Sequence, residues 1–164
     1  MKKLFFAFLL IWPLAASADE LVPVGTTSRA IDVFISDSSS STGAGLTGLV
    51  YNTLGLSCYY HRSGANAATA ISLATMMLGT WATSGFVAVD GINMPGWYQL
   101  GVPDAAFAAG ASYVTIQCKG ATNMAPMNLR VILTANPPDV NISKWNGTTV
   151  TGTGPTSSGR PGQR

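Results

Sequence analysis

The fold of this chain is decided by residues 85–100, which read GFVAVDGINMPGWYQL. Residues 86–89 are apolar and β-prone, residues 90–91 and 94–96 carry turn-forming Asp, Gly and Pro, and residues 97–100 resume an alternating pattern. Proline presets one turn dihedral and glycine supplies positive φ, so the chain is expected to reverse here for local reasons. The segment predicts a strand, a turn and a second strand, and it contains no obvious catalytic side chains.

The first 18 residues have the three regions of a signal peptide. Lys2 and Lys3 give a positive start, residues 4–14 are an apolar core, and residues 16–18 read ASA, a small-x-small cleavage pattern. The apolar stretch is too short for a membrane span of roughly 20 residues. The sequence therefore predicts that residues 1–18 form a cleaved leader; a non-cleaved anchor and a buried start to the fold are the alternatives.

The charge balance changes if the leader is removed. The chain has 9 Lys and Arg and 7 Asp and Glu, and loss of Lys2 and Lys3 leaves equal numbers of each sign. No basic run remains to neutralise a phosphate backbone, so no nucleic-acid partner is expected.

Short apolar segments separated by Gly, Pro and Asn turns predict an all-β domain, an antiparallel β-sandwich of immunoglobulin-like or jelly-roll-like type. The expected extended segments are residues 29–36, 46–51, 54–62, 70–73, 80–83, 85–90, 97–100, 111–119 and 127–134. One short helical turn is predicted at residues 103–110, with Asp104 as its cap and Gly110 just past its end.

The domain boundaries follow from composition. Residues 19–28 are expected to be a flexible lead-in, and residues 29–136 to form the sandwich. After Pro137 and Pro138 the chain turns to Gly, Thr, Ser and Pro. Residues 137–164 are therefore predicted to be a linker and a disordered tail.

The two cysteines, Cys58 and Cys118, each lie in a strand-like run. In an oxidising compartment they are able to pair. Their spacing, with Trp81 between them, matches the two-sheet disulfide of immunoglobulin domains only loosely, since Trp81 lies too far past Cys58 and Ile116 stands where the tyrosine corner would place Tyr. Two free cysteines acting as small buried hydrophobes are the alternative.

The sequence contains few of the side chains that catalytic sites need. His61 is the only histidine, so a Ser-His-Asp or Cys-His site would have to use it, and a surface or edge histidine is the preferred interpretation. The chain has no GxSxG, HExxH, P-loop or CxxC motif. We therefore expect no enzymatic activity, no cofactor, no metal site and no small-molecule substrate.

The aromatic residues are the remaining resource for binding. Tyr59 and Tyr60 are adjacent on a predicted strand and must face opposite ways, so at least one of them is expected to face outward. Both are named as candidate surface-binding aromatics. Trp81, Phe86 and Trp97 are assigned to the core in preference to a sugar-binding face.

The order of several short motifs resembles a β-sandwich module found near the start of tailed-bacteriophage baseplate, tail-fibre and head-fibre proteins. The resemblance covers residues 31–147, and its motifs lie at residues 34–37, 45–49, 56–60, 85–90, 94–100, 103–106, 120–126 and 140–147. It implies a role in virion assembly and brings no catalytic residues. It also marks a core signature made of Trp81, Phe86, Pro95, Gly96, Trp97 and Tyr98.

The resemblance implies other virion structural proteins as partners, a homo-oligomer, a location in the virion, and a host surface glycan as a further ligand. Two features depart from the family, whose proteins continue into further domains and carry no leader. The alternatives are an exported carbohydrate- or cell-surface-binding module, periplasmic or secreted, and an enzyme that works through His61.

Overall fold

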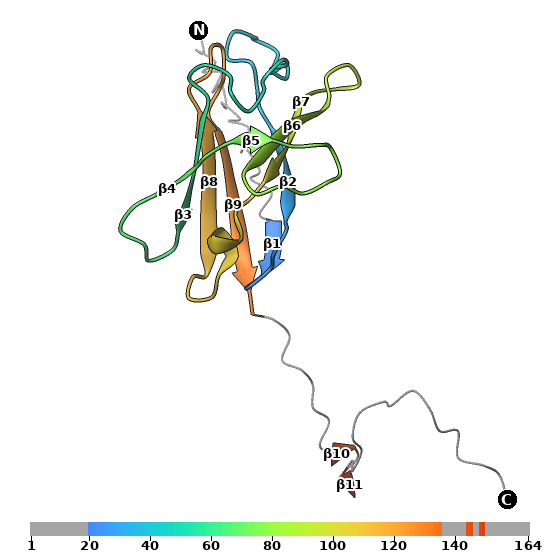
Figure 1. Ribbon diagram of the computed structural model, residues 1–164, viewed down its shortest axis with the longest axis vertical. Helices are drawn as coiled ribbons and strands as arrows, with labels where there is room; N and C mark the ends of the chain where they lie inside the picture. Colours follow the sequence, from blue (N-terminus) through green and yellow to red (C-terminus); the bar gives the residue numbers. More distant parts are fainter. Residues whose placement is uncertain (1–19, 136–143, 146–147, 150–164) are drawn as a thin grey trace, which may run out of the picture. The chain divides into compact units, whose positions relative to one another are not determined.

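The structure is a computed structural model that describes residues 20–135 together with residues 144–145 and 148–149. Residues 20–134 form two sheets around one core (Figure 1). The predicted fold class, a β-sandwich, is confirmed. One sheet has five strands in the order β1 (Glu20–Pro23), β9 (Met127–Thr134), β8 (Tyr113–Lys119), β3 (Ser57–Arg62) and β4 (Thr69–Ile71). The other has four, in the order β2 (Ala30–Phe34), β7 (Met94–Gly101), β6 (Gly85–Asp90) and β5 (Ala74–Thr75).

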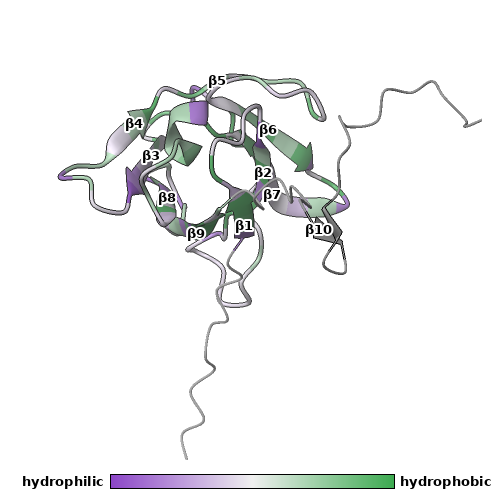
Figure 2. Cartoon of the chain, turned by 90° about the horizontal axis from the view of Figure 1, so that it is seen from below, coloured by the Kyte–Doolittle hydropathy of each residue, from purple (hydrophilic) through white to green (hydrophobic). Residues whose placement is uncertain are grey.

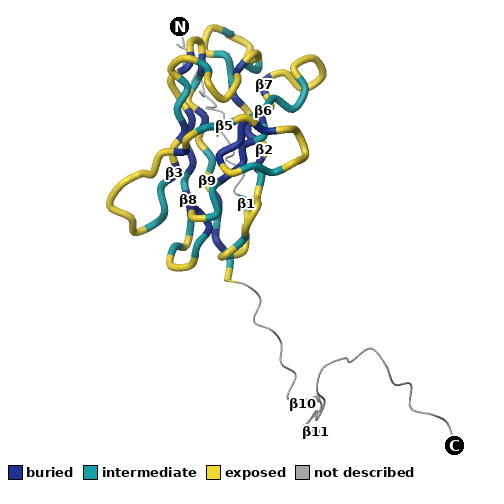
Figure 3. The backbone as a smooth tube through the Cα atoms, viewed as in Figure 1, coloured by how far each residue is buried: buried dark blue, intermediate teal, exposed yellow. Residues whose placement is uncertain are grey.

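The core lies between the two sheets and follows the period-two alternation of the strands. On β2, Ile31 and Val33 point inward and are buried, and Ile35 beyond the strand end is buried as well. Asp32 and Phe34 alternate with them on the outer side, as the sequence predicted. Figure 3 shows the buried segments gathered where the sheets face each other.

The hairpin of β6 and β7 is the segment from which the fold was predicted. The reversal occurs at Asp90, whose Oδ1 accepts hydrogen bonds from the backbone amides of Ile92 (2.8 Å) and Asn93 (2.9 Å). The second predicted turn, at residues 94–96, is instead part of β7. Gly96 has a φ of +86° there because the chain bends around the loop at Gly45, and a Cβ on Gly96 would overlap the Gly45 backbone.

The predicted strand at residues 46–51 is absent. These residues form a loop whose backbone is bonded to a side chain and not to a neighbouring strand. The buried Tyr98 hydroxyl donates to the Leu46 carbonyl (2.7 Å) and accepts from the Leu49 amide (3.2 Å). Burial raises the pKa of Tyr98, and the Leu49 hydrogen bond partly opposes that shift. Its ring stacks on Phe86, with ring centroids 4.9 Å apart.

Residues 19–28 were predicted to be a flexible lead-in, and this prediction is wrong for residues 20–23. Glu20–Pro23 form β1, which pairs parallel to β9 and buries Val22. An ion pair joins Arg29 to Glu20 (2.6 Å). The second parallel pairing joins β5 to β6, so the sandwich is antiparallel except at these two edges.

The predicted helical turn is a single 3-10 turn, η1 (Asp104–Phe107). Asp104 does not cap it; Pro103 holds the N-cap position, and Asp104 Oδ1 instead accepts from the Ser28 amide (2.8 Å). Ala106 and Phe107 are fully buried, so the turn packs into the core.

Two further expectations differ from the structure. Residues 80–83 form no strand, and Thr80 makes only an isolated bridge to Met77. Residues 70–73 divide between β4 and the crossover to β5, where the chain passes from one sheet to the other.

The leader at residues 1–18 lies outside the described residues. So does most of the predicted tail, in which only β10 (Lys144–Trp145) and β11 (Thr148–Thr149) are described, as an antiparallel pair. Among the residues that the structure describes, no helix has the length and apolarity to cross a membrane.

Candidate binding faces

The two cysteines are bonded to each other, but they do not join the two sheets. Cys58 on β3 and Cys118 on β8 are direct partners in neighbouring strands of the five-stranded sheet, with Cα atoms 4.1 Å apart. Both are fully buried. The loose immunoglobulin comparison fails here because that disulfide crosses between sheets, whereas this one links two strands within one sheet.

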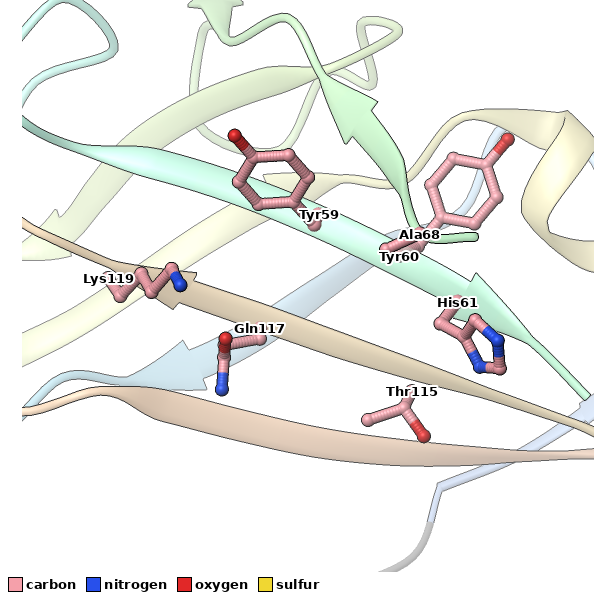
Figure 4. Close-up of a pocket in the computed structure, with 7 residues that line it drawn as sticks. All are labelled: Tyr59, Tyr60, His61, Ala68, Thr115, Gln117 and Lys119. Atoms are coloured by element: carbon pink, nitrogen blue, oxygen red, sulfur yellow. The ribbon is translucent and has the colours of Figure 1, made fainter. Parts of the chain in front are cut away.

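The outer face of the five-stranded sheet carries a groove of about 350 Å³ along β3 and β8 (Figure 4). Its lining consists mainly of polar and aromatic side chains: Tyr59, Tyr60, His61, Ala68, Thr115, Gln117 and Lys119. The strand pairing sets Tyr59 opposite Gln117 and His61 opposite Thr115. These side chains are therefore positioned by one rigid ladder.

The tyrosines face opposite sides of the sheet, as predicted, and only one of them is a surface residue. Tyr59 is 37% exposed, whereas Tyr60 is 8% exposed and belongs to the core. Tyr60 as a surface-binding aromatic was therefore wrong. Sequence alternation could have decided this, since Cys58 and Tyr60 share one side of β3 and both are buried.

Hydrogen bonds fix two polar side chains of this face. Gln117 Nε2 donates to Asn128 Oδ1 on β9 (2.7 Å). His61 Nε2 donates to the Ala65 carbonyl (3.0 Å), since a carbonyl only accepts. Neither contact assembles a catalytic triad.

Acidic side chains are absent from four of the five strands of this sheet, and the fifth strand, β1, carries Glu20, which is paired with Arg29. Strands β3, β4, β8 and β9 contain no Asp or Glu, whereas Lys119 lies at the end of β8 and Arg130 lies on β9. The Arg130 guanidinium stands over the Tyr113 ring, 4.1 Å from its centroid.

The outer face of the four-stranded sheet carries two exposed aromatic side chains. Figure 2 shows that β6 in this sheet consists largely of hydrophobic residues. Phe34 on β2 and Trp97 on β7 are direct partners whose ring centroids lie 5.5 Å apart. They are 38% and 37% exposed. The assignment of Trp97 to the core was wrong, because the pleat places Tyr98 and Leu100 inward and so turns Trp97 outward.

Exposed apolar side chains also lie on the two hairpin-like segments beside this face. The β6–β7 reversal presents Ile92, which is 89% exposed, together with Met94. The loop between β5 and β6 presents Met77 and Leu78, and its Gly79 amide donates to Gln99 Oε1 on β7 (3.1 Å).

Of the two other residues assigned to the core, Phe86 and Trp81, one is buried and the other is only partly buried. Phe86 is buried, as assigned. Trp81 is only half-buried, and its indole Nε1 is shielded from solvent with no hydrogen-bond partner within the described residues. Among those residues, no three or more His, Cys, Asp or Glu side chains gather in a way that could hold a metal ion.

Two surface carboxyl groups have lowered pKa values. Hydrogen bonds from the Asn93 backbone and side-chain amides, and from the Ile92 amide, lower the pKa of Asp90. Those from the Ser39 hydroxyl and amide lower the pKa of Asp37. Both carboxylates close loops, which is the role expected of Asp beside a turn.

Comparisons with protein-family models, with curated proteins and with solved structures found no match.

Proposed function

We propose that this chain is a non-enzymatic structural module of a phage-like particle, which binds a protein partner through the outer face of its four-stranded sheet. The observation that carries the proposal is the exposed Phe34–Trp97 pair. Aromatic side chains concentrate at protein interfaces, and a buried Trp commonly supplies a large share of the binding energy. The partner is another virion structural protein, including a second copy of this chain.

The surroundings of the pair support this assignment. Val87 lies on the outer side of β6, opposite Gln99 of β7. The loop residues Met77 and Ile92 add exposed apolar side chains. Asp32 on β2 and Asp90 at the end of β6 are the two charged side chains on the four strands of this sheet. A surface with so little charge suits the centre of an interface, where charged residues are depleted.

The test begins with gradient-purified particles of the phage that encodes the chain. Quantitative mass spectrometry is expected to find the chain in fixed ratio to the capsid protein. Recovery of the chain only as a free secreted monomer, absent from particles, would overturn the proposal.

The face is tested separately with Trp97→Ala, supplied in place of the wild-type gene. Because Trp97 is partly exposed, the variant is expected to fold and to be lost from the particles. Tyr59→Ala removes an equally exposed aromatic from the opposite sheet and is the matched control, expected to be incorporated normally. Equal incorporation of the two variants would contradict the assignment of this face.

A second function is favoured by the groove beside Tyr59. We propose as the alternative an exported module that binds carbohydrate on a cell surface, periplasmic or secreted through its leader. Ligand sites are lined mainly by aromatic and apolar side chains, with a few polar groups that orient the ligand. The groove combines the Tyr59 ring with the polar side chains of Thr115, Gln117 and Lys119. Binding of a fluorescent preparation of the chain to a glycan array tests it, and an array without signal would remove it.

A further inference from the structure

The side chains that line the groove beside Tyr59 limit the class of ligand that it can bind. It combines an exposed ring, the side chains of Gln117 and Thr115 on the neighbouring strand, and a lysine at one end (Figure 4). Pyranose rings present C–H groups on one face and hydroxyls at the edge. The C–H groups pack against the negative face of an aromatic ring, and polar side chains hold the hydroxyls.

The free hydrogen-bonding groups match sugar hydroxyls. Gln117 uses its Nε2 to donate to Asn128, so its Oε1 is left to accept from a hydroxyl. His61 uses its Nε2 to donate to Ala65, so its Nδ1 is left for the groove. The Thr115 hydroxyl can donate or accept.

The charged side chains on the strands around the groove favour a negatively charged ligand. Lys119 lines the groove, and Arg130 lies opposite Thr115 on the next strand. Within the described part of the chain the ion pair is Arg29–Glu20, so neither of these two cations is neutralised by a described carboxylate. A negative group entering the groove therefore meets positive charge and no acidic side chain from β3, β4, β8 or β9.

We propose that this groove binds a saccharide that carries a carboxylate. Tyr59 stacks on the sugar ring, Gln117 and Thr115 bind hydroxyls, and Lys119 binds the carboxylate. The inference rests on the second of the functions proposed above, carbohydrate binding, and holds whether or not the chain is part of a particle.

The test is isothermal titration of the purified, oxidised full chain with trigalacturonate, and with maltotriose as a neutral saccharide of the same length. Binding of trigalacturonate that weakens with added salt, with maltotriose at least roughly tenfold weaker, supports the proposal. Equal binding of both saccharides would overturn the acidic specificity and leave carbohydrate binding standing. Binding of neither would overturn the acidic-saccharide assignment, whereas carbohydrate binding as a whole is overturned by a glycan array without signal.

Three variants locate the site. Tyr59→Ala and Lys119→Gln are each expected to weaken trigalacturonate binding roughly tenfold, and Lys119→Arg to retain it. Tyr51→Ala is the matched control, because Tyr51 is 40% exposed on a loop outside the groove. Thermal unfolding shows whether each variant is folded. Loss of binding in Tyr51→Ala equal to that in Tyr59→Ala, or tighter binding of a thymidine trinucleotide than of trigalacturonate, would refute the assignment.

Discussion

The Tyr98 hydroxyl donates a 2.7 Å hydrogen bond to the carbonyl of Leu46, 52 positions earlier in the chain. The same hydroxyl accepts from the Leu49 amide, so one side chain fixes both ends of a short loop segment. Tyr98 lies on β7, next to the outward Trp97, and its ring stacks on Phe86 in the core. One side chain thus connects β7, an inner strand of the four-stranded sheet, to the loop at residues 46–49.

Replacing Tyr98 by Phe is expected to lower the free energy of unfolding by about 1–3 kcal/mol. The ring and its stacking remain, but the Leu46 carbonyl and the Leu49 amide lose their partner. Urea unfolding followed by tryptophan fluorescence measures the change. Tyr59→Phe removes a hydroxyl at the surface and is expected to be nearly neutral; equal losses in the two variants would argue against the structural role of the Tyr98 hydroxyl.

Gly45→Ala is expected to destabilise the domain by at least about 2 kcal/mol. A Cβ at Gly45 would overlap the backbone of Pro95 and Gly96, where the loop crosses β7, and neither backbone can move aside. Gly91→Ala is the control, because a Cβ there meets nothing within 4 Å and its φ is not left-handed. The urea midpoints should separate the two variants clearly, and an unchanged Gly45→Ala midpoint would show that the crossing is looser than described.

Loss of the disulfide is expected to destabilise the domain by about 4 kcal/mol in the chain-entropy account of a loop this long. Cys58 and Cys118 are 60 residues apart in sequence. The double variant Cys58→Ala, Cys118→Ala should unfold at a lower urea concentration than the oxidised protein, and a reductant should shift the wild type alone. If reductant leaves the wild-type midpoint in place, the bond makes no net contribution to stability.

Asp90 is expected to make stability depend on pH. Its folded-state pKa is lowered by the Asn93 and Ile92 hydrogen bonds, so its contribution is fully present above the unfolded value of about 4 and is lost as the pH falls through the folded value. The difference in urea midpoint between wild type and Asp90→Ala should therefore be largest near neutral pH and shrink in acid. A difference that stays constant from neutral pH to well below the folded pKa would contradict this.

The strands with clear alternation could be predicted from the sequence. The bounds of β9 coincide with the predicted segment at residues 127–134, and β6 with residues 85–90. In both cases several β-prone residues in a row carry the signal. β1 could not be found in this way, since it has four residues, ends at Pro23 and depends on a partner more than a hundred positions away.

The loop at residues 46–51 shows why apolar content alone misleads. Leu49 is buried and Leu46 packs against the core, so their pattern resembles that of a strand. Their backbone groups, however, bond to the Tyr98 side chain and to Ile35, and not to a neighbouring strand. Local sequence carries no information on such a distant side-chain partner.

The sequence predicted some of the residues of the candidate sites, but not which residues lie next to each other in them. The sequence offered Tyr59 and Tyr60 together as candidate surface aromatics and did not choose between them. The neighbours of Tyr59, Gln117 and Thr115, come from a strand whose register is set by the whole sheet. Likewise Phe34 was placed on the outer side of its strand, yet its contact with Trp97 required the pairing of β2 with β7. A sequence shows the residue types, whereas the cross-strand pairs that bring them together depend on the register of the folded sheet.

The parallel pairing of β1 with β9 also sets the order of events during synthesis. Glu20 lies beside Val131 and Pro23 beside Thr134. The first strand of the domain therefore cannot pair until the last strand has been synthesised. A ribosome or an export channel releases the chain from the N-terminus onward. The five-stranded sheet therefore cannot be completed until nearly the whole domain has emerged, and a nascent chain halted before residue 127 would leave β1 without its partner.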